Sequence, residues 1–399
     1  MQNIIIDKSY EFVPPYRGRF FSSLLKHFVP RYLERNFGIV DVSCRDEHHL
    51  NESLAAGHGV LLTPNHCRPC DPMVVAALAR SVGTHLFLMA SWHVFMQGRW
   101  VRWLARAAGA FSVYREGMDR AAVNAAVEIL ERAERPLVIF PEGVISRTND
   151  RLNNLMDGTA FIARTAARKR AKSEEGGKVV VHPVAVRYLL AGDASDSIDA
   201  VLDEIETRLT WTPQRGLPIV ERITRLGHAL LSLKEIEFVG AVRTGSVPER
   251  LTTLIDAILG PLEAKWVEGR GDGSVVDRVK RLRTAIVPEI IDDSLDEAAR
   301  RERWKHLADC YLAQQLSNYP PAYVRANPVP ERIVETVERF EEDLTDRARI
   351  HGPMKVVMQV GPAIEVSARR DRQETTDPLM QAIGEHLERM LAETAPDGQ

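Results

Sequence analysis

The stretch Thr63 to Pro72, TPNHCRPCDP, places a histidine, two cysteines and an aspartate within six positions of one another. Residues of these types can bind a metal, form a redox pair or hold a catalytic base. A metal site would use all four side chains, but no second Cys/His pair of suitable spacing occurs elsewhere in the sequence. A redox pair would need only Cys67 and Cys70, but their flanks lack a thioredoxin-like pattern.

The third interpretation uses only His66 and Asp71, in the pattern N-H-x-x-x-x-D. A carboxylate that accepts a hydrogen bond from one imidazole nitrogen leaves the other nitrogen free to take a proton from a hydroxyl. The apolar run Gly59 to Leu62 predicts a strand that feeds this turn, and strand ends are where open α/β domains build their sites. The alternatives are that Asp71 only caps the next helix and that His66 is only a polar loop residue.

A second predicted strand, Leu137 to Phe140, also ends at a carboxylate. It runs into Pro-Glu-Gly, which contains Glu142 and Gly143, and Arg147 follows. Backbone amides near a glycine can approach an anion, and an arginine can donate two hydrogen bonds to one phosphate. The alternative for this segment is a plain turn.

The elements that must position these residues alternate between short apolar runs and helical patterns from Gly59 to Tyr188, which predicts an α/β domain. The expected strands are Val60–Thr63, His85–Met89, Ala110–Val113, Leu137–Phe140 and Val179–Val186. The expected helices between them are Pro72–Ser81, Arg120–Ala133 and Thr159–Lys169.

The pattern becomes helical from about Ser195 to Arg349, with breaks rich in Pro and Gly. Lys355 to Ser367 again alternates like a strand, and Asp377 to Ala392 predicts a closing helix. We therefore expect a mixed central sheet flanked by helices, with a helical insertion or a second helical subdomain. The expected regions are an N-terminal amphipathic or helical membrane-contact region (1–57), the α/β core (58–192), the helical insertion (193–352) and the closing strand and helix (353–399). No internal repeat is evident.

Composition indicates a folded globular protein, because 45% of the 399 residues are hydrophobic and 27% are charged. A formal net charge of -3 does not favour a nucleic-acid partner. Four cysteines are too few for a disulfide framework, so we expect reduced thiols in a cytosolic setting. Neither a secretory signal nor an apolar run of about 18 residues is visible, so we expect a protein that does not cross a membrane.

Two segments mix cations with aromatic side chains, as surfaces that contact a membrane do. One is Tyr16 to Leu33, and the other is Trp92 to Ala107, which contains Trp100 and Trp103. The alternative is that the aromatic side chains pack in the core and that the arginines are only solvated.

Taken together, the motifs resemble those of the glycerolipid acyltransferases, the family of lysophosphatidic acid, glycerol-3-phosphate and related lysophospholipid acyltransferases. NHCRPCD resembles the first motif of the family, and FPEG resembles the third. Gly109 to Arg115 resembles the second motif, Val179 to Val186 the fourth, and Val360 to Val366 the strand that usually ends the domain. The resemblance covers about residues 59–188 and 355–392.

The resemblance implies a role for each matching residue. His66 would be the general base on the acceptor hydroxyl, Asp71 its orienting partner and Arg115 the anchor of the acceptor phosphate. Glu142 and Gly143 would belong to the acceptor site.

The sequence departs from the family pattern in two places. Val144 and Ile145 follow FPEG where the family has Thr or Ser and then Arg, so the arginine comes later, at Arg147. The helical insertion is foreign to a minimal member, and it would cover the acyl channel or recruit a partner.

The implied activity is transfer of a fatty acyl group from an acyl-CoA or acyl-carrier-protein thioester to the hydroxyl of a phosphate-bearing lysolipid. Neither a metal nor a bound cofactor would be needed. The protein would lie on the cytoplasmic, inner face of a membrane, with the lysophospholipid and the thioester as partners. The alternatives are a different hydroxylated acceptor, a non-catalytic lipid-binding scaffold, and a metal or thiol sensor at Cys67 and Cys70.

Overall fold

The computed structural model divides the chain into two compact units. The sheet unit comprises Glu11–Val113, Asp119–Asp193 and Ile350–Gln399, and the helical unit comprises Met1–Tyr10, Tyr114–Met118 and Ala194–Arg349. The residues described are 8–172, 176–269, 271–291, 295–319, 322–345, 347–369 and 377–395.

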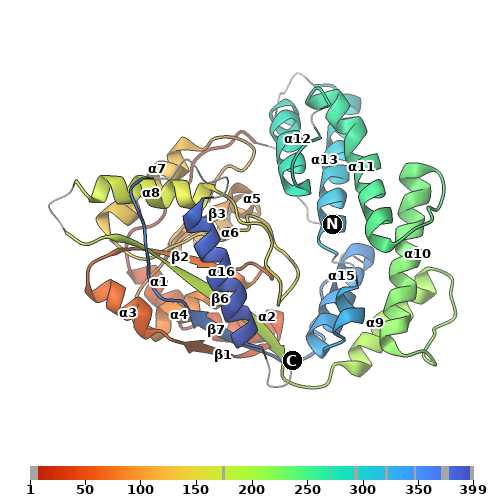
Figure 1. The fold of residues 1–399 in the computed structure, drawn as a ribbon, viewed down its shortest axis with the longest axis horizontal. Helices are drawn as coiled ribbons and strands as arrows, with labels where there is room; N and C mark the ends of the chain where they lie inside the picture. The colour runs from red at the N-terminus through yellow and green to blue at the C-terminus, as the bar shows by residue number, and fades with distance from the viewer. Residues whose placement is uncertain are drawn as a thin grey trace. The chain divides into compact units, whose positions relative to one another are not determined.

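The sheet unit is built on an eight-stranded mixed sheet in the order β1-β7-β6-β2-β5-β3-β4, with β8 paired to β6 (Figure 1). Neighbouring strands run parallel except where β6 pairs with β7 and with β8. The strands are β1 (Ile39–Arg45), β2 (Gly59–Pro64), β3 (Phe87–Ser91), β4 (Ala110–Val113), β5 (Leu137–Val138), β6 (Val179–Leu190), β7 (Met354–Val360) and β8 (Ile364–Glu365).

Helices cover both faces of this sheet, and every residue of β2 is buried as a result. On one face lie α7 (Arg120–Arg132), α8 (Gly158–Arg170) and α16 (Pro378–Glu393), and on the other lie α2 (Val29–Phe37), α3 (His48–Ala55) and α4 (Asp71–Ser81) (Figure 1). The remaining helices of the unit are α1 (Phe20–Leu25), α5 (Trp92–Met96) and α6 (Arg99–Ala107).

The strands expected from the sequence are present, with shifted ends. β3 begins at Phe87 instead of His85, β5 is shorter than Leu137–Phe140, and β6 is longer than Val179–Val186. The region 1–57, expected to be amphipathic or helical, also contains a strand, because β1 joins the sheet there beside β7. β1 is an edge strand that pairs with a segment more than 300 positions away. The alternation of apolar and polar residues from Val40 to Cys44 is a local signal for this strand.

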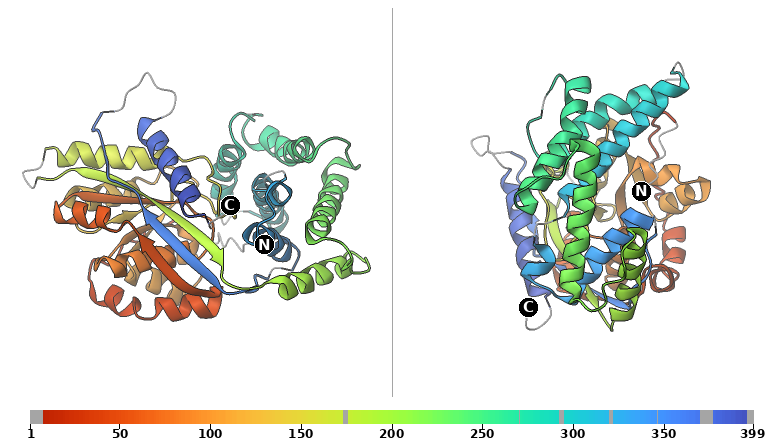
Figure 2. Two further views of the ribbon diagram at one scale, coloured as in Figure 1. Left: turned by 60° about the horizontal axis from the view of Figure 1, so that its bottom comes forward. Right: turned by 90° about the vertical axis from the view of Figure 1, so that its right-hand side faces the viewer.

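The helical unit contains helices that pack against chain neighbours and also against more distant helices, as α9 does against α15 (Figure 2). They are α9 (Ser195–Arg208), α10 (Ile219–Val239), α11 (Val247–Trp266), α12 (Val275–Ile290), α13 (Glu297–Ser317), α14 (Tyr323–Ala326) and α15 (Pro330–Thr345). α11, α12 and α13 share a core that includes Leu254, Leu282 and Cys310.

A repeated ion pair joins successive helices of this unit, so the expectation of no internal repeat is wrong. Arginines at the fourth position of α10, α11 and α12 recur every 28 residues, and each binds a buried glutamate near the end of the preceding helix. The pairs are Arg222 with Glu206, Arg250 with Glu235 and Arg278 with Glu263, at 2.6, 2.7 and 2.7 Å. The sequence does carry a signal for this repeat, because Leu226, Leu254 and Leu282 recur at the same spacing, as do Ala229, Ala257 and Ala285.

The main segment of the helical unit is inserted between two paired strands. β6 leads into it and β7 follows it, and Leu190 of β6 lies opposite Met354 of β7 in an antiparallel ladder. The Ala191 amide donates to the Pro353 carbonyl oxygen at 2.8 Å. The sheet therefore holds both ends of the insertion together.

Candidate active site

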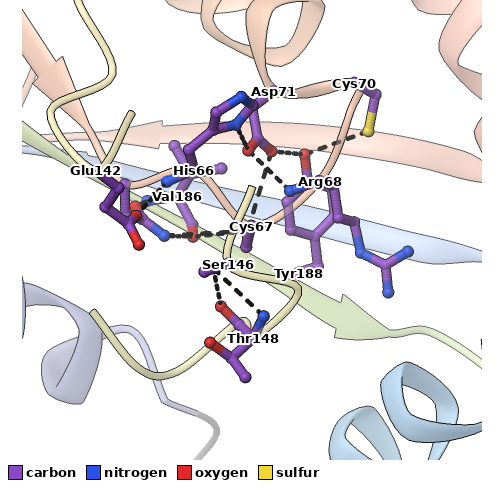
Figure 3. A network of polar contacts seen from close by, with 11 residues as sticks. His66, Cys67, Arg68, Cys70, Asp71, Glu142, Ser146, Thr148, Val186 and Tyr188 are labelled. Atoms are coloured by element: carbon purple, nitrogen blue, oxygen red, sulfur yellow. Dashed lines mark hydrogen bonds and ion pairs between the residues drawn. The ribbon is translucent and has the colours of Figure 1, made fainter. Parts of the chain in front are cut away.

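His66 and Asp71 form a hydrogen-bonded pair where β2 gives way to α4 (Figure 3). His66 Nδ1 lies 2.7 Å from Asp71 Oδ2, and the imidazole stacks on the Phe140 ring with centroids 4.2 Å apart. The imidazole is 16% exposed, whereas the carboxylate is fully buried. Among the residues that the structure describes, no hydrogen bond to His66 Nε2 is found, so this nitrogen is open to a substrate.

Asp71 accepts hydrogen bonds from several groups besides His66 (Figure 3). The Arg68 amide donates to Oδ2 at 2.9 Å, and the Tyr188 hydroxyl donates to Oδ1 at 2.5 Å. The Cys67 thiol is a weak donor to Oδ1 at 3.9 Å. Such a set of donors stabilises a buried carboxylate. The carboxylate thus orients His66. The alternative that Asp71 only caps a helix does not account for its contacts with His66 and Tyr188.

Tyr188 is a member of this network that sequence reasoning missed. It lies on β6 and is fully buried, and its hydroxyl reaches both Asp71 and Cys70 Sγ, the latter at 3.4 Å. Burial, and then the negative charge of Asp71, raise the pKa of Tyr188 well above its ordinary value. The hydroxyl therefore stays protonated and donates to the carboxylate. The available signal was a tyrosine in a buried strand, since a buried phenol needs a polar partner.

The two cysteines of the stretch are buried thiols that surround the pair. Cys67 Sγ also lies 4.0 Å from the Val186 carbonyl oxygen. Burial raises the pKa of Cys70 to about 11, which disfavours the thiolate that redox exchange requires. In the described part of the chain, no group of three or more side chains that could hold a metal ion is found. Of the three interpretations, the structure favours the base.

Glu142 ties the FPEG turn to the backbone of the His66 loop (Figure 3). Its Oε1 accepts from the His66 amide at 2.7 Å, and its Oε2 accepts from the Asn153 amide at 3.1 Å. The side chain is 1% exposed, and this burial raises its pKa to about 7. These contacts make Glu142 a support for the position of His66.

Gly143 and Arg147 belong to the same turn. Gly143 has a φ of +68°, and a Cβ there would lie 2.2 Å from Met156 Sδ, so only glycine fits. Its amide donates to the Phe140 carbonyl oxygen at 3.2 Å. Arg147 is half-buried with a φ of +59°, next to Ser146, whose amide donates to the His66 carbonyl oxygen at 2.7 Å. The third motif thus contacts the first through backbone hydrogen bonds.

Arg115 is placed differently from the other predicted site residues. It lies two positions beyond β4 in the short segment Tyr114–Met118, which belongs to the helical unit. Its side chain is exposed. His66, Asp71, Glu142, Gly143 and Arg147 all belong to the sheet unit.

A histidine that a carboxylate orients at a strand end of an α/β sheet is an arrangement that can take a proton from a hydroxyl group. Residues 45–187 match the family model described as Acyltransferase, and all six predicted site residues lie within that range. The chain carries a domain of the glycerolipid acyltransferase family, whose chemistry is acyl transfer. No curated protein matches the chain. Most of the helical unit lies outside the matched range.

Proposed function

We propose that this protein transfers a fatty acyl group from an acyl-CoA or acyl-carrier-protein thioester to the hydroxyl of a phosphate-bearing lysolipid such as a 1-acylglycerol 3-phosphate. The observation that carries the proposal is the open Nε2 of His66, whose Nδ1 is held at 2.7 Å by the buried carboxylate of Asp71. This arrangement suits a base that acts on a hydroxyl without a protein nucleophile.

The reaction follows from that geometry. His66 Nε2 takes the proton of the acceptor hydroxyl as its oxygen attacks the thioester carbonyl, and Asp71 stabilises the imidazolium that forms. This attack forms the ester C–O bond and a tetrahedral oxyanion. The oxyanion then collapses, which re-forms the carbonyl and cleaves the C–S bond. The departing thiolate takes the proton from His66, which restores the neutral base. No external oxidant or metal enters this balance.

The acceptor phosphate requires a cation, and we assign this role to Arg115, with Arg147 as a second candidate. Guanidinium groups bind phosphate through paired hydrogen bonds. Arg115 is exposed, whereas Arg147 is half-buried in the turn beside His66. We assign Glu142 and Gly143 to shaping the acceptor site through the His66 loop.

We further propose that the protein binds the cytoplasmic face of a membrane through α1 and α6. No helix in the described part of the chain is long and apolar enough to cross a membrane. Phe20 and Trp100 are 70% and 78% exposed, and Phe21 of α1 packs edge-on against Trp103 of α6 with centroids 5.2 Å apart. The two segments that contain these rings also carry exposed arginines, including Arg19, Arg31, Arg99 and Arg106. Exposed aromatic side chains among cations suit an anionic lipid surface.

The test measures thiol release from palmitoyl-CoA by the wild type and by His66→Gln, each with and without lysophosphatidic acid. We expect release that depends on the lysolipid, and a loss of about 10²- to 10⁴-fold in kcat for His66→Gln, the usual contribution of a general base. The matched control is His386→Gln on α16, where a histidine is lost away from the site. A wild-type rate in His66→Gln would refute the mechanism.

The acceptor panel separates the alternatives. Monoacylglycerol differs from lysophosphatidic acid only by lacking the phosphate, so equal turnover of the two would favour a different hydroxylated acceptor. Acyl-carrier-protein thioesters are tested as donors in parallel. Binding of lysolipid vesicles without thiol release from either donor would favour the non-catalytic scaffold.

A further inference from the structure

The segment Tyr114–Met118, which contains Arg115, is anchored by the helical unit. Tyr114 packs against the core shared by α11, α12 and α13. Its ring also stacks on Tyr10, with centroids 5.0 Å apart and planes 19° from parallel. The residue before Arg115 is therefore held by apolar contacts within the helical unit.

The residue after Arg115 is held by an ion pair. Glu116 is 3% exposed, and its Oε1 accepts hydrogen bonds from Nε and Nη2 of Arg283 at 3.2 and 2.5 Å. Arg283 lies on α12, and its side chain is 15% exposed. A charge pair with so little exposure is costly to break, since removing one partner leaves the other charge buried and unpaired.

Arg115 lies between these two anchored residues with its side chain exposed. Part of this side chain reaches water, but its pKa is lowered. The larger cause is the loss of water around the charged group, and the smaller cause is the positive charge of Arg283. The positive charge of Arg283 therefore acts on Arg115. The affinity of a site for a phosphate dianion rises when cations lie nearby. It also rises when the backbone needs no further ordering as the ligand binds.

We propose that Arg283 and Glu116 are positioning residues that hold Arg115 for the phosphate of the acceptor. This inference rests on the proposed function, because it takes Arg115 as the phosphate anchor. It gives the insertion a defined role in substrate selection.

The test compares steady-state kinetics of the full-length wild type with Arg283→Met and Glu116→Gln, with palmitoyl-CoA as donor. We expect each change to raise the KM for lysophosphatidic acid about tenfold or more, with little effect on kcat or on the KM for palmitoyl-CoA. The KM for monoacylglycerol, which has no phosphate, should stay unchanged. Arg283→Lys keeps a cation at this position, so it should raise the KM for lysophosphatidic acid less than Arg283→Met does. Lys280→Met, an exposed cation on the same helix, is the matched control and should behave as wild type.

A double change decides whether the effect passes through Arg115. Once Arg115→Met has removed the anchor, adding Arg283→Met should have almost no further effect on the KM for lysophosphatidic acid. Additive effects, or equal losses with monoacylglycerol, would overturn the inference. Thermal unfolding identifies any variant that does not fold. If Arg283→Met does not fold, the KM values of the milder Arg283→Lys and Glu116→Gln test the inference instead.

The two proposals fail in different ways. If the wild type releases no thiol with any acceptor, the proposed function fails. If the wild type acylates lysophosphatidic acid and Arg283→Met leaves its KM unchanged, the proposed function stands and the role of Arg283 is refuted.

Discussion

At the scale of single residues, the site depends on a buried carboxylate that is fully supplied with donors. Asp71 accepts from His66, from the Arg68 amide and from the Tyr188 hydroxyl. Each hydrogen bond fixes one direction of the carboxylate, so the imidazole plane is set before a substrate arrives. Preorganisation of this kind removes reorganisation from the reaction itself.

Tyr188→Phe tests this network. Removing the hydroxyl takes one donor from the charged Asp71 and leaves the packing of the ring intact, and hydrogen bonds to charged groups contribute about 1.5–3 kcal/mol. We expect kcat to fall about 10- to 100-fold, with little change in either KM, as measured by thiol release. Tyr319→Phe is the matched control, because it removes a hydroxyl that donates to Asp343 in the helical unit. An unchanged kcat in Tyr188→Phe would show that His66 and Arg68 suffice to orient Asp71.

At the scale of elements, contacts between α1 and α6 make one surface from two segments that are far apart in the sequence. The Phe21 ring meets the Trp103 ring, and the Tyr16 amide donates to the Arg106 carbonyl oxygen at 3.2 Å. Both segments keep large apolar side chains in water, at Phe20, Phe28 and Trp100 among others. Exposed apolar groups that gather in this way mark an interaction surface.

Combining Phe20→Ser with Trp100→Ser tests the membrane surface. We expect sedimentation with vesicles rich in anionic lipids to weaken at least tenfold, because two interfacial anchors are lost, and a loss of about 1.4 kcal/mol already corresponds to tenfold. Phe161→Ser removes an aromatic ring that is 60% exposed on α8 and should leave vesicle binding unchanged. Undiminished binding of the double variant would place the lipid contact elsewhere.

At the scale of the whole molecule, the chain combines a sheet unit with an inserted helical unit. The antiparallel pairing of β6 and β7 brings Ala191 and Pro353 into hydrogen-bond contact across the insertion. The repeated arginine and glutamate pairs between α9, α10, α11 and α12 give the helical unit its own internal bonding. Each unit thus has its own hydrophobic core, one between sheet and helices and one among helices.

Replacing residues 194–349 with Asn-Gly tests how independent the sheet unit is. We expect this variant to fold with a cooperative thermal transition, because a short loop can join two strands that already pair as a hairpin does. We also expect it to lose acylation of lysophosphatidic acid, because Tyr114 and Glu116 lose their partners. Circular dichroism and thiol release measure the two outcomes. A variant without a cooperative transition would show that the sheet unit needs the helical unit to fold.

Much of the fold followed from local patterns. β2 and α4 were predictable to within one residue at each end and β4 in full, because apolar runs bounded by turn residues report local structure. β1 and the helical repeat were missed although each leaves a signal in the sequence, in the alternation from Val40 to Cys44 and in the leucines and alanines that recur every 28 residues. In both cases the stabilising partners lie outside the segment itself, and only the structure identifies them.

The sequence by itself determined that His66 and Asp71 can meet, because a strand, a tight turn and a helix start bring residues five positions apart into contact. It also carried the order of motifs that identifies the family. Only the tertiary structure decided the rest of the site. Glu142 reaches His66 across 76 positions, Tyr188 reaches Asp71 across 117, and Arg283 reaches Glu116 across 167. Local propensity holds no information on such contacts, because they form only when the sheet order and the packing of the inserted helices bring distant segments together.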